Sequence, residues 1–199
     1  MSDEIVSYSI DQILQYQQNR YPMLFIDHVT KCEPGRYALG YKLFSINEWY
    51  FHGYDTDAPK VWNAIQLEAM SQMLLMSFIT LDECKGMKAM SNKFDKVNFR
   101  RKIEPGDRLN LEAELLSFRR GIAKGKVRGF IGSELACDME CTIVVPELMI
   151  GAMLKSAPAE TQVPVTFEFE NSSDFGIARI QDCLLNKYPW LLIDRAINV

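Results

Sequence analysis

Residues 64–81 read AIQLEAMSQMLLMSFITL, a run of apolar side chains interrupted by a single charge at Glu68. Apolar residues recur on nearly every face at helical spacing, which is typical of a helix that is buried on most of its sides. A lone carboxylate inside such a helix is costly unless it is protonated or hydrogen-bonded. The run therefore predicts a central buried helix, and it marks Glu68 as a candidate functional residue.

Strand patterns lie on both sides of this helix along the chain. Residues 109–115 alternate strictly between apolar and polar, which predicts a strand with one buried face. Turn signals such as Pro34-Gly35 and Arg120-Gly121 separate further apolar runs. The expected strands are Met23–Val29, Arg36–Phe44, Phe94–Arg101, Leu109–Leu115, Ile122–Phe130 and a last one that ends near Val145. One buried helix with several long antiparallel strands predicts an α+β fold in which the sheet wraps around the helix.

The overall composition excludes several classes of protein. The 199-residue chain has 48% hydrophobic residues, enough for a sizeable core, and a net charge of -4, which argues against a general nucleic-acid binder. The N-terminus is acidic with no apolar run behind it, and the longest apolar run, Met73–Leu81, is too short to span a bilayer. We therefore expect a cytoplasmic protein that binds neither nucleic acid nor membrane.

The cysteines and histidines show no metal-ligand spacing. Cys137 and Cys141 could share one face of a strand, but neither of the two histidines, His28 and His52, is near them in the sequence. We expect no metal site, no cofactor and reduced thiols at all five cysteines, which are Cys32, Cys84, Cys137, Cys141 and Cys183.

The end of the chain repeats its beginning. Residues 19–27, NRYPMLFID, are echoed by residues 186–194, NKYPWLLID, at a constant offset of 167 (186 minus 19). A short helix is expected before each copy, over Ser9–Gln18 in the first and around Ile177 and Ile180 in the second. Because a repeat of this kind indicates repeated structural units, we expect a first domain over 1–148, a linker over 149–172 and the opening of a second unit over 173–199.

Several motifs together resemble the 3-hydroxyacyl-acyl-carrier-protein dehydratases, over about residues 10–145 with almost no gaps. That family typically opens with Arg-Tyr-Pro-Phe-Leu-Leu-Val-Asp, which Arg20–Asp27 resembles. The likeness continues through Asn47-Glu48, Phe51, Glu68–Gln72, Asn98–Arg101, Glu104–Asp107 and Arg119–Ile122. The resemblance implies a hotdog fold, in which a long antiparallel sheet wraps around a central helix and two such units pair. Residues 173–199 would then begin a second hotdog repeat.

The resemblance also implies a chemistry. The substrate would be a 3-hydroxyacyl thioester on acyl carrier protein, or on coenzyme A. A histidine would take the proton next to the thioester, since imidazole titrates near neutral pH. A carboxylate on the central helix, here Glu68, would protonate the departing hydroxyl. A backbone amide at the helix N-terminus, here that of Asn63, would polarise the thioester oxygen.

This chain departs from the family at the histidine position, which is occupied by Tyr54. A phenol with a pKa near 10 is a poor base at neutral pH. The change extends through Asp55, Thr56 and Asp57 and on through Lys60–Asn63, where the family has Val-Met-Pro-Gly. Asparagine in place of glycine at position 63 could block close approach of the thioester. The pattern predicts a remodelled site on an intact scaffold.

Two residues leave the activity open. His52 could act as a substitute base, since residues two apart on an extended segment share a face, or it could be an exposed or capping histidine before a turn. Glu68 could be the family's acid, or an inherited carboxylate that is hydrogen-bonded by backbone amides or by Gln72. A basic set consisting of Arg100, Arg101, Lys102, Arg119 and Arg120 could hold an acidic carrier protein, or consist of ordinary solvated strand ends.

Three functions remain in consideration. The first is a degenerate dehydratase unit that binds acyl thioesters and pairs with a second hotdog unit, as a homodimer or within a longer chain. The second is an active dehydratase using His52 and Glu68, or a thioesterase in which Glu68 activates water. The third is a purely structural module.

Overall fold

The computed structural model describes residues 5–51, 59–153, 176–183 and 192–193. The chain divides into two compact units, of which the first comprises residues 1–46 and 60–156 and the second comprises residues 47–59 and 157–199. The first unit contains the sheet and the long helix.

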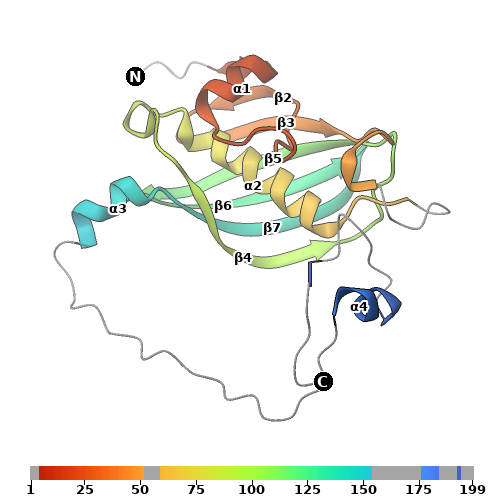
Figure 1. Cartoon of the computed structure of the whole chain (residues 1–199). Helices are drawn as coiled ribbons and strands as arrows, with labels where there is room; N and C mark the ends of the chain where they lie inside the picture. Colours follow the sequence, from red (N-terminus) through yellow and green to blue (C-terminus); the bar gives the residue numbers. More distant parts are fainter. Residues whose placement is uncertain (1–4, 52–58, 154–175, 184–191, 194–199) are drawn as a thin grey trace, which may run out of the picture. The chain divides into compact units, whose positions relative to one another are not determined.

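A seven-stranded antiparallel sheet forms most of the first unit, in the order β1-β2-β3-β5-β6-β7-β4. Figure 1 shows this sheet curving around the long helix α2, which is the arrangement that the sequence predicts. The strands are β1 (Val6–Tyr8), β2 (His28–Glu33), β3 (Tyr37–Leu43), β4 (Met90–Phe99), β5 (Arg108–Arg119), β6 (Ile122–Ile131) and β7 (Glu134–Val144). The helices of this unit are α1 (Ile10–Tyr16), α2 (Asn63–Ile79), the short η2 (Asp82–Cys84) and α3 (Pro146–Met153).

Helix α2 is the centre of the core, and its side chains from Ala69 to Ile79 are all buried. Glycines on the inner face of the sheet allow this close packing. A Cβ at Gly40 would meet the Met73 side chain at 2.6 Å, and one at Gly125 would overlap the Leu74 side chain. A strand glycine is typical where another element approaches closely.

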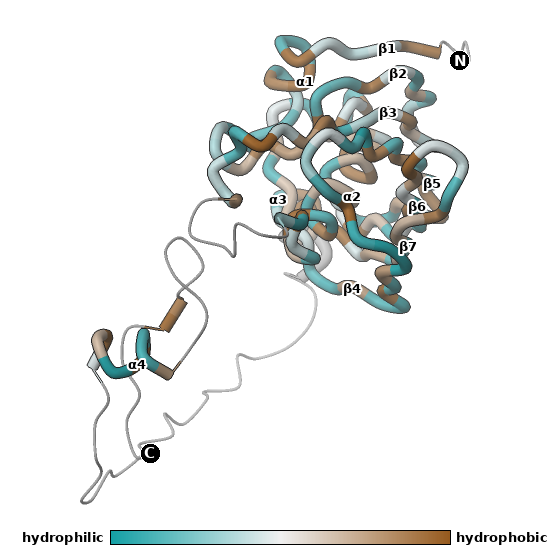
Figure 2. Tube along the Cα trace, turned by 90° about the vertical axis from the view of Figure 1, so that its right-hand side faces the viewer, coloured by the Kyte–Doolittle hydropathy of each residue, from teal (hydrophilic) through white to brown (hydrophobic). Residues whose placement is uncertain are grey.

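Cross-strand ion pairs cover the opposite face of the sheet. Arg128 on β6 lies between Glu112 on β5 and Asp138 on β7 in the strand register. Arg128 pairs with Glu112 at 2.8 Å, and Arg100, just past β4, pairs with Asp138 at 2.7 Å. The polar and apolar residues therefore alternate along these strands, as the changing colours of the tube in Figure 2 show.

The strand expected over Met23–Val29 is wrong for Met23–Asp27, because β2 begins only at His28. In the residues before β2, backbone N–H and carbonyl groups are hydrogen-bonded to a side chain and not to a neighbouring strand. The amide of Gln72 accepts a hydrogen bond from Phe25 N–H and donates one to the Met23 carbonyl. Because its backbone is hydrogen-bonded to a side chain of α2, this apolar segment does not form a strand.

Other boundaries also differ. Strand β4 begins four residues before the expected Phe94, and the short edge strand β1 was not expected at all. The expected linker is helical at its start, because α3 runs from Pro146 to Met153. Proline is well accepted at the first position of a helix, where its missing N–H has no intrahelical partner, so Pro146 begins this helix and does not end the domain.

The second unit contains the short helices η1 (Trp49–Phe51) and α4 (Ile177–Cys183). Helix α4 agrees with the helix expected around Ile177 and Ile180, and Ile180 is buried. The echo of the Tyr-Pro motif at Tyr188-Pro189 lies outside the described residues. The second hotdog repeat therefore stays a prediction.

Candidate functional site

Glu68 lies in the second turn of α2, where its carboxylate is half-buried and hydrogen-bonded by two side-chain amides. Gln72, one turn further along the same face, donates from Nε2 to Oε1 of Glu68 at 2.8 Å. Asn19 donates from Nδ2 to the same oxygen at 3.4 Å. Of the two kinds of partner expected for an inherited carboxylate, backbone amides or Gln72, the structure shows Gln72.

Gln72 is itself fixed on every side. Its Nε2 also donates to the Met23 carbonyl at 2.7 Å, and its Oε1 accepts from Phe25 N–H at 2.8 Å. The buried Gln17 side chain donates to the Gln72 carbonyl at 2.9 Å. Because both ends of the Gln72 amide are used, the amide cannot turn over without breaking three hydrogen bonds. It therefore holds Oε1 of Glu68 in one orientation.

Both hydrogen bonds that the Glu68 carboxylate accepts from described residues reach Oε1, which leaves Oε2 without a partner among those residues. A cavity of about 200 Å³ opens beside this carboxylate. Its walls are formed mainly by α2, the residues after α1 and the start of the edge strand β4. The lining residues are Gln18, Asn19, Glu68, Ser71, Gln72, Leu75, Ala89, Met90, Ser91 and Ile143. Oε2 is thus the oxygen that is available to a bound ligand.

The N-terminus of α2 supplies backbone donors. The first intrahelical bonds are donated by Ile65 and Gln66 to the Trp62 carbonyl, so the amides of Asn63 and Ala64 have no acceptor within the helix. Asn63 is exposed. The segment before the helix is held by a hydrogen bond from Val61 N–H to the Ile103 carbonyl at 2.7 Å. The amide of Asn63 is thus a free helix N-terminal donor, but Asn63 does not line the cavity beside Glu68, and its role at the thioester oxygen stays a prediction.

Tyr54 and His52 lie in residues 52–58, outside the described part of the chain. Their expected roles near Glu68 remain predictions.

The expected basic residues fall into two separate groups. Arg100, Arg101 and Lys102 follow β4. Arg101 donates a hydrogen bond to Asp107, the residue before β5. Arg119 and Arg120 lie at the other end of β5, about 35 Å away along the strand at ~3.3 Å per residue. The five residues therefore form two clusters, and their binding of a carrier protein stays a prediction.

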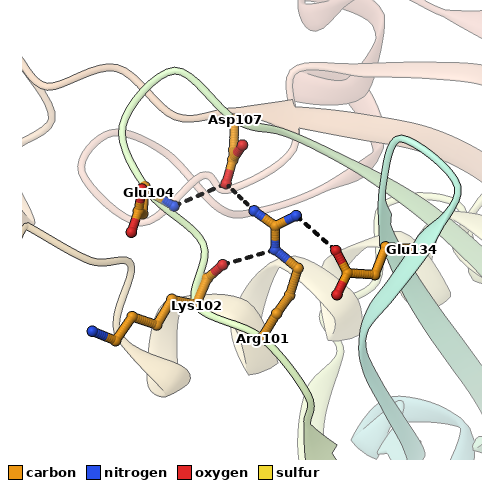
Figure 3. Close-up of polar contacts among 5 residues, drawn as sticks. All are labelled: Arg101, Lys102, Glu104, Asp107 and Glu134. Carbon is orange, nitrogen blue, oxygen red and sulfur yellow. Dashed lines mark hydrogen bonds and ion pairs between the residues drawn. The ribbon is translucent and has the colours of Figure 1, made fainter.

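Arg101 is used within the fold, as Figure 3 shows. Its guanidinium donates to Glu134 at 3.0 Å, to Asp107 at 3.3 Å and to the Lys102 carbonyl at 2.9 Å. Asp107 also accepts from Glu104 N–H at 3.0 Å. Arg101 thus fixes the turn between β4 and β5 against the start of β7, whereas Lys102, Arg119 and Arg120 are exposed.

Arg100 is also paired within the fold. Burial opposes ionisation of Asp138, but hydrogen bonds from Arg100 and Asn98 and the charge of Arg100 outweigh it and hold the pKa of Asp138 below its usual value. The charge of Arg100 is therefore used in an ion pair that stabilises the sheet.

The described cysteines of the first unit offer no nucleophile. Burial raises the pKa of Cys32 and Cys84 to about 11 and that of Cys137 and Cys141 to about 12, so they remain thiols at neutral pH. Within the described residues no group of three His, Cys, Asp or Glu side chains could hold a metal ion. None of the described helices is long and apolar enough to cross a bilayer.

Residues 18–140 match the FabA-like domain family. A 3-hydroxyacyl-[acyl-carrier-protein] dehydratase FabZ from Moorella thermoacetica is 39% identical over 129 residues, which cover 65% of this chain and 90% of the relative. The corresponding FabZ proteins of Chloroflexus aggregans and Clostridioides difficile are 37% and 32% identical, over 70% of this chain and 96% and 98% of their own lengths.

Solved structures share the fold at low sequence identity. The dehydratase heterocomplex ApeI:P from Xenorhabdus doucetiae aligns with a TM-score of 0.57 at 14% identity, over 72% of this chain and 97% of that one. An uncharacterized protein, PH1136 from Pyrococcus horikoshii, aligns with a TM-score of 0.52 at 14% identity, over 66% and 91%. Together with the sheet and its central helix, these matches establish the α+β hotdog architecture of the first unit.

Proposed function

The chain belongs to the FabA-like family, and from this membership we propose that its first unit binds 3-hydroxyacyl thioesters in the cavity beside Glu68. The observation that carries the proposal is the retained carboxylate, held by Gln72 at the edge of a cavity of about 200 Å³. The thioester would be carried by acyl carrier protein or coenzyme A.

The geometry assigns different roles to the two oxygens of Glu68. Oε1 accepts two amide hydrogen bonds, so a proton carried by this carboxyl belongs on Oε2. In a dehydration, a base removes the proton at the α-carbon while Oε2–H protonates the 3-hydroxyl, and the products are an enoyl thioester and water. The amides of Asn63 and Ala64 would stabilise the negative charge on the thioester oxygen.

In the first form of the proposal, the part that this unit lacks is the base. Tyr54 stands where the resemblance places the family's histidine, and a phenol, with an ordinary pKa near 10, is a poor base at neutral pH. We therefore expect the unit to bind substrate while dehydrating it slowly, with full activity supplied by a paired hotdog unit. The degenerate site is thus the first form of the proposal.

The intact setting of Glu68 favours a second form, in which this unit is active. His52 would then take the α-proton in place of the residue at position 54, with Glu68 as the acid. Alternatively, Glu68 would activate water for attack on the thioester carbonyl, and the products would be a free acid and a thiol. In both cases the three hydrogen bonds that fix Gln72 serve to orient the carboxylate.

The edge strand β4 supports pairing with a second copy of this hotdog unit. It is exposed along most of its length, and Met90 and Phe94 expose 54% and 38% of their surfaces. A long open edge with exposed apolar side chains is a template for pairing. Met90 and Ser91 also line the cavity, so a unit paired here would border the site.

The test is dehydration of a 3-hydroxyacyl-pantetheine thioester by the 199-residue chain, followed by the enoyl absorbance. For a degenerate unit, the unchanged chain turns over at least ~100-fold more slowly than Tyr54→His, in line with the contribution of a positioned base. Glu68→Gln abolishes turnover in both backgrounds, and Glu83→Gln, which changes an exposed carboxylate, has no effect.

Other results decide between the two forms. Fast turnover by the unchanged chain that is lost in His52→Ala identifies the active dehydratase, and release of free thiol without enoyl product identifies the thioesterase. Failure of every variant to bind the thioester would overturn the proposal as a whole.

A further inference from the structure

Asn19 and Gln72 donate to the same two acceptors, but at different distances. Nε2 of Gln72 lies 2.7 Å from the Met23 carbonyl and 2.8 Å from Oε1 of Glu68. Nδ2 of Asn19 lies 3.5 Å from that carbonyl and 3.4 Å from that carboxylate oxygen. Hydrogen bonds from N–H to oxygen usually span about 2.7–3.2 Å, so both bonds from Asn19 are weak. Gln72 therefore already serves both acceptors, and the Asn19 side chain is not needed to hold the carboxylate.

The main chain of Asn19, in contrast, is held by its neighbour Arg20. The guanidinium donates to the carbonyls of Leu14 and Gln17 at 2.9 Å and 2.6 Å, and to the Asn19 carbonyl at 2.8 Å. These bonds tie the residues after α1 to the end of that helix, where the last carbonyls have no intrahelical partners. The amide group of Asn19 can thus turn toward a ligand while its main chain stays in place.

The oxygen of the Asn19 amide is unused within the described part of the chain. Oδ1 accepts no hydrogen bond from the described residues, and neither does Oε2 of Glu68. Both side chains line the cavity beside Glu68. Because Nδ2 of Asn19 lies 3.4 Å from Oε1, the two open oxygens belong to neighbouring groups. The cavity therefore offers a ligand two acceptor oxygens, of which Oε2 becomes a donor when the carboxyl is protonated.

An alcohol matches this pair of oxygens, because a hydroxyl donates one hydrogen bond and also accepts. Resting on the function proposed above, we infer that Asn19 positions the substrate: its Oδ1 accepts a hydrogen bond from the 3-hydroxyl, while Oε2–H of Glu68 donates to the oxygen of that hydroxyl. A hydroxyl held in this way presents a lone pair to the acid, which is the orientation that proton transfer requires. Asn19 thereby selects thioesters with a 3-hydroxyl over those without one.

The same contact serves the departing water. In the dehydration, the α-proton passes to the base and the proton of Oε2 passes to the hydroxyl oxygen, while the C3–O bond breaks with its electron pair remaining on that oxygen. The original hydroxyl hydrogen stays in place and keeps its bond to Asn19, so the products are an enoyl thioester and a water molecule bound to Oδ1. A saturated acyl thioester has no such donor and gains nothing from Asn19.

Two matched ligands test this inference without turnover. They are the pantetheine amides of 3-hydroxybutyrate and of butyrate, in which nitrogen replaces the thioester sulfur and lowers the acidity of the α-proton, so that dehydration does not proceed during the titration. Each is titrated into the 199-residue chain by calorimetry, and the ratio of the two Kd values measures the contribution of the hydroxyl. One hydrogen bond changes a Kd about two- to tenfold. We therefore expect the 3-hydroxy ligand, with two such bonds, to bind at least ~fivefold more tightly.

Substitutions at position 19 should reduce this ratio. Asn19→Ala removes the acceptor and lowers the ratio at least ~threefold, while the butyrate ligand binds as before. Asn19→Leu keeps a side chain of similar shape without its polar atoms, and the same fall in the ratio separates the hydrogen bond from a loss of volume. Gln18→Ala is the matched control, because Gln18 lines the same cavity but bonds to the Ala89 carbonyl and not to Glu68, so the ratio stays unchanged.

Circular dichroism confirms that each variant is folded. Equal binding of the two ligands by the unchanged chain, or a ratio unaffected by both substitutions of Asn19, would overturn the role of Asn19 and leave the proposed function standing. An equal fall in Gln18→Ala would also overturn it, since any change of the cavity wall would then have the same effect. No binding of either ligand to the unchanged chain would overturn both.

Discussion

Gln72 is the residue on which the site and the core both depend. Its side-chain amide makes three hydrogen bonds, to Glu68, Met23 and Phe25, and is only 2% exposed. A buried amide with all of these partners is rigid, and a rigid partner fixes the orientation of the carboxylate that it binds.

We predict that Gln72→Leu lowers the free energy of unfolding by about 1–3 kcal/mol, because Phe25 N–H and the Met23 carbonyl lose their partners. Urea denaturation of this variant is compared with Gln15→Leu, which changes an exposed glutamine on α1. Equal midpoints for Gln72→Leu and the unchanged chain would show that the three hydrogen bonds contribute nothing.

At this scale the sequence predicted part of the site. Glu68 stands out because it is the lone charge in an apolar helix, and Gln72 follows from the spacing of four residues along that helix. Asn19, Gln17 and the backbone of Phe25 could not be found in this way. They lie 47 to 55 residues from their partners, so only the tertiary fold brings them together.

At the scale of elements, the strands of the sheet are joined by side-chain contacts as well as by their backbone hydrogen bonds. Asp138 on β7 accepts hydrogen bonds from Asn98 on β4 and from Arg100, just past the end of that strand. This cluster lies where the edge strand leaves the sheet, so its ion pair helps to keep β4 in register.

We predict that the stability provided by Asp138 depends on pH. Its pKa is lowered in the folded state, so its contribution is present above the unfolded pKa, near 4, and is lost as the pH falls through the lower folded value. Asp138→Asn should therefore melt below the unchanged chain at pH 7, and this difference should shrink as the pH falls below about 4.

Melting temperatures at pH 7, 5, 4 and 3 test this, with Asp11→Asn at an exposed residue of α1 as the control. A difference between Asp138→Asn and the unchanged chain that stays constant down to pH 3 would contradict the prediction.

Sequence patterns predicted the elements that are buried on all sides or that alternate regularly between buried and exposed residues. Helix α2 and strand β5 are clear, because one is apolar on all sides and the other alternates strictly. The segment from Met23 to Asp27 has an equally apolar pattern, but the Gln72 side chain bonds to the backbone of Met23 and Phe25, and no local pattern reveals this distant partner. Strand β1 has three residues, which is too short for any periodicity.

At the scale of the whole molecule, the sheet has two edges of very different kinds. The edge at β1 is a strand of three residues with an irregular register. The edge at β4 is ten residues long and exposes Met90 and Phe94. The register of β4 is itself irregular at two places, but a short edge resists pairing and a long exposed one promotes it, so β4 is the edge at which association is expected.

We predict that the 199-residue chain associates through β4, and that the double substitution Met90→Lys and Phe94→Lys weakens this association at least tenfold through charge repulsion and lost apolar contact. Sedimentation over a range of concentrations measures the effect, with Leu116→Lys on β5 as the control. Identical sedimentation of the double variant and the unchanged chain would exclude this edge.

The hydrogen bond between Gln72 and Glu68 has a consequence for how such a chain diverges over time. If Glu68 were replaced by an apolar residue, a buried donor of Gln72 would lose its acceptor at a cost of about 1–3 kcal/mol, a large part of a typical domain's stability. A lineage that had given up the reaction would still be selected against this loss. A carboxylate at position 68 is therefore expected in an active unit and in a unit that has lost the reaction, and only the turnover of Glu68→Gln distinguishes the two.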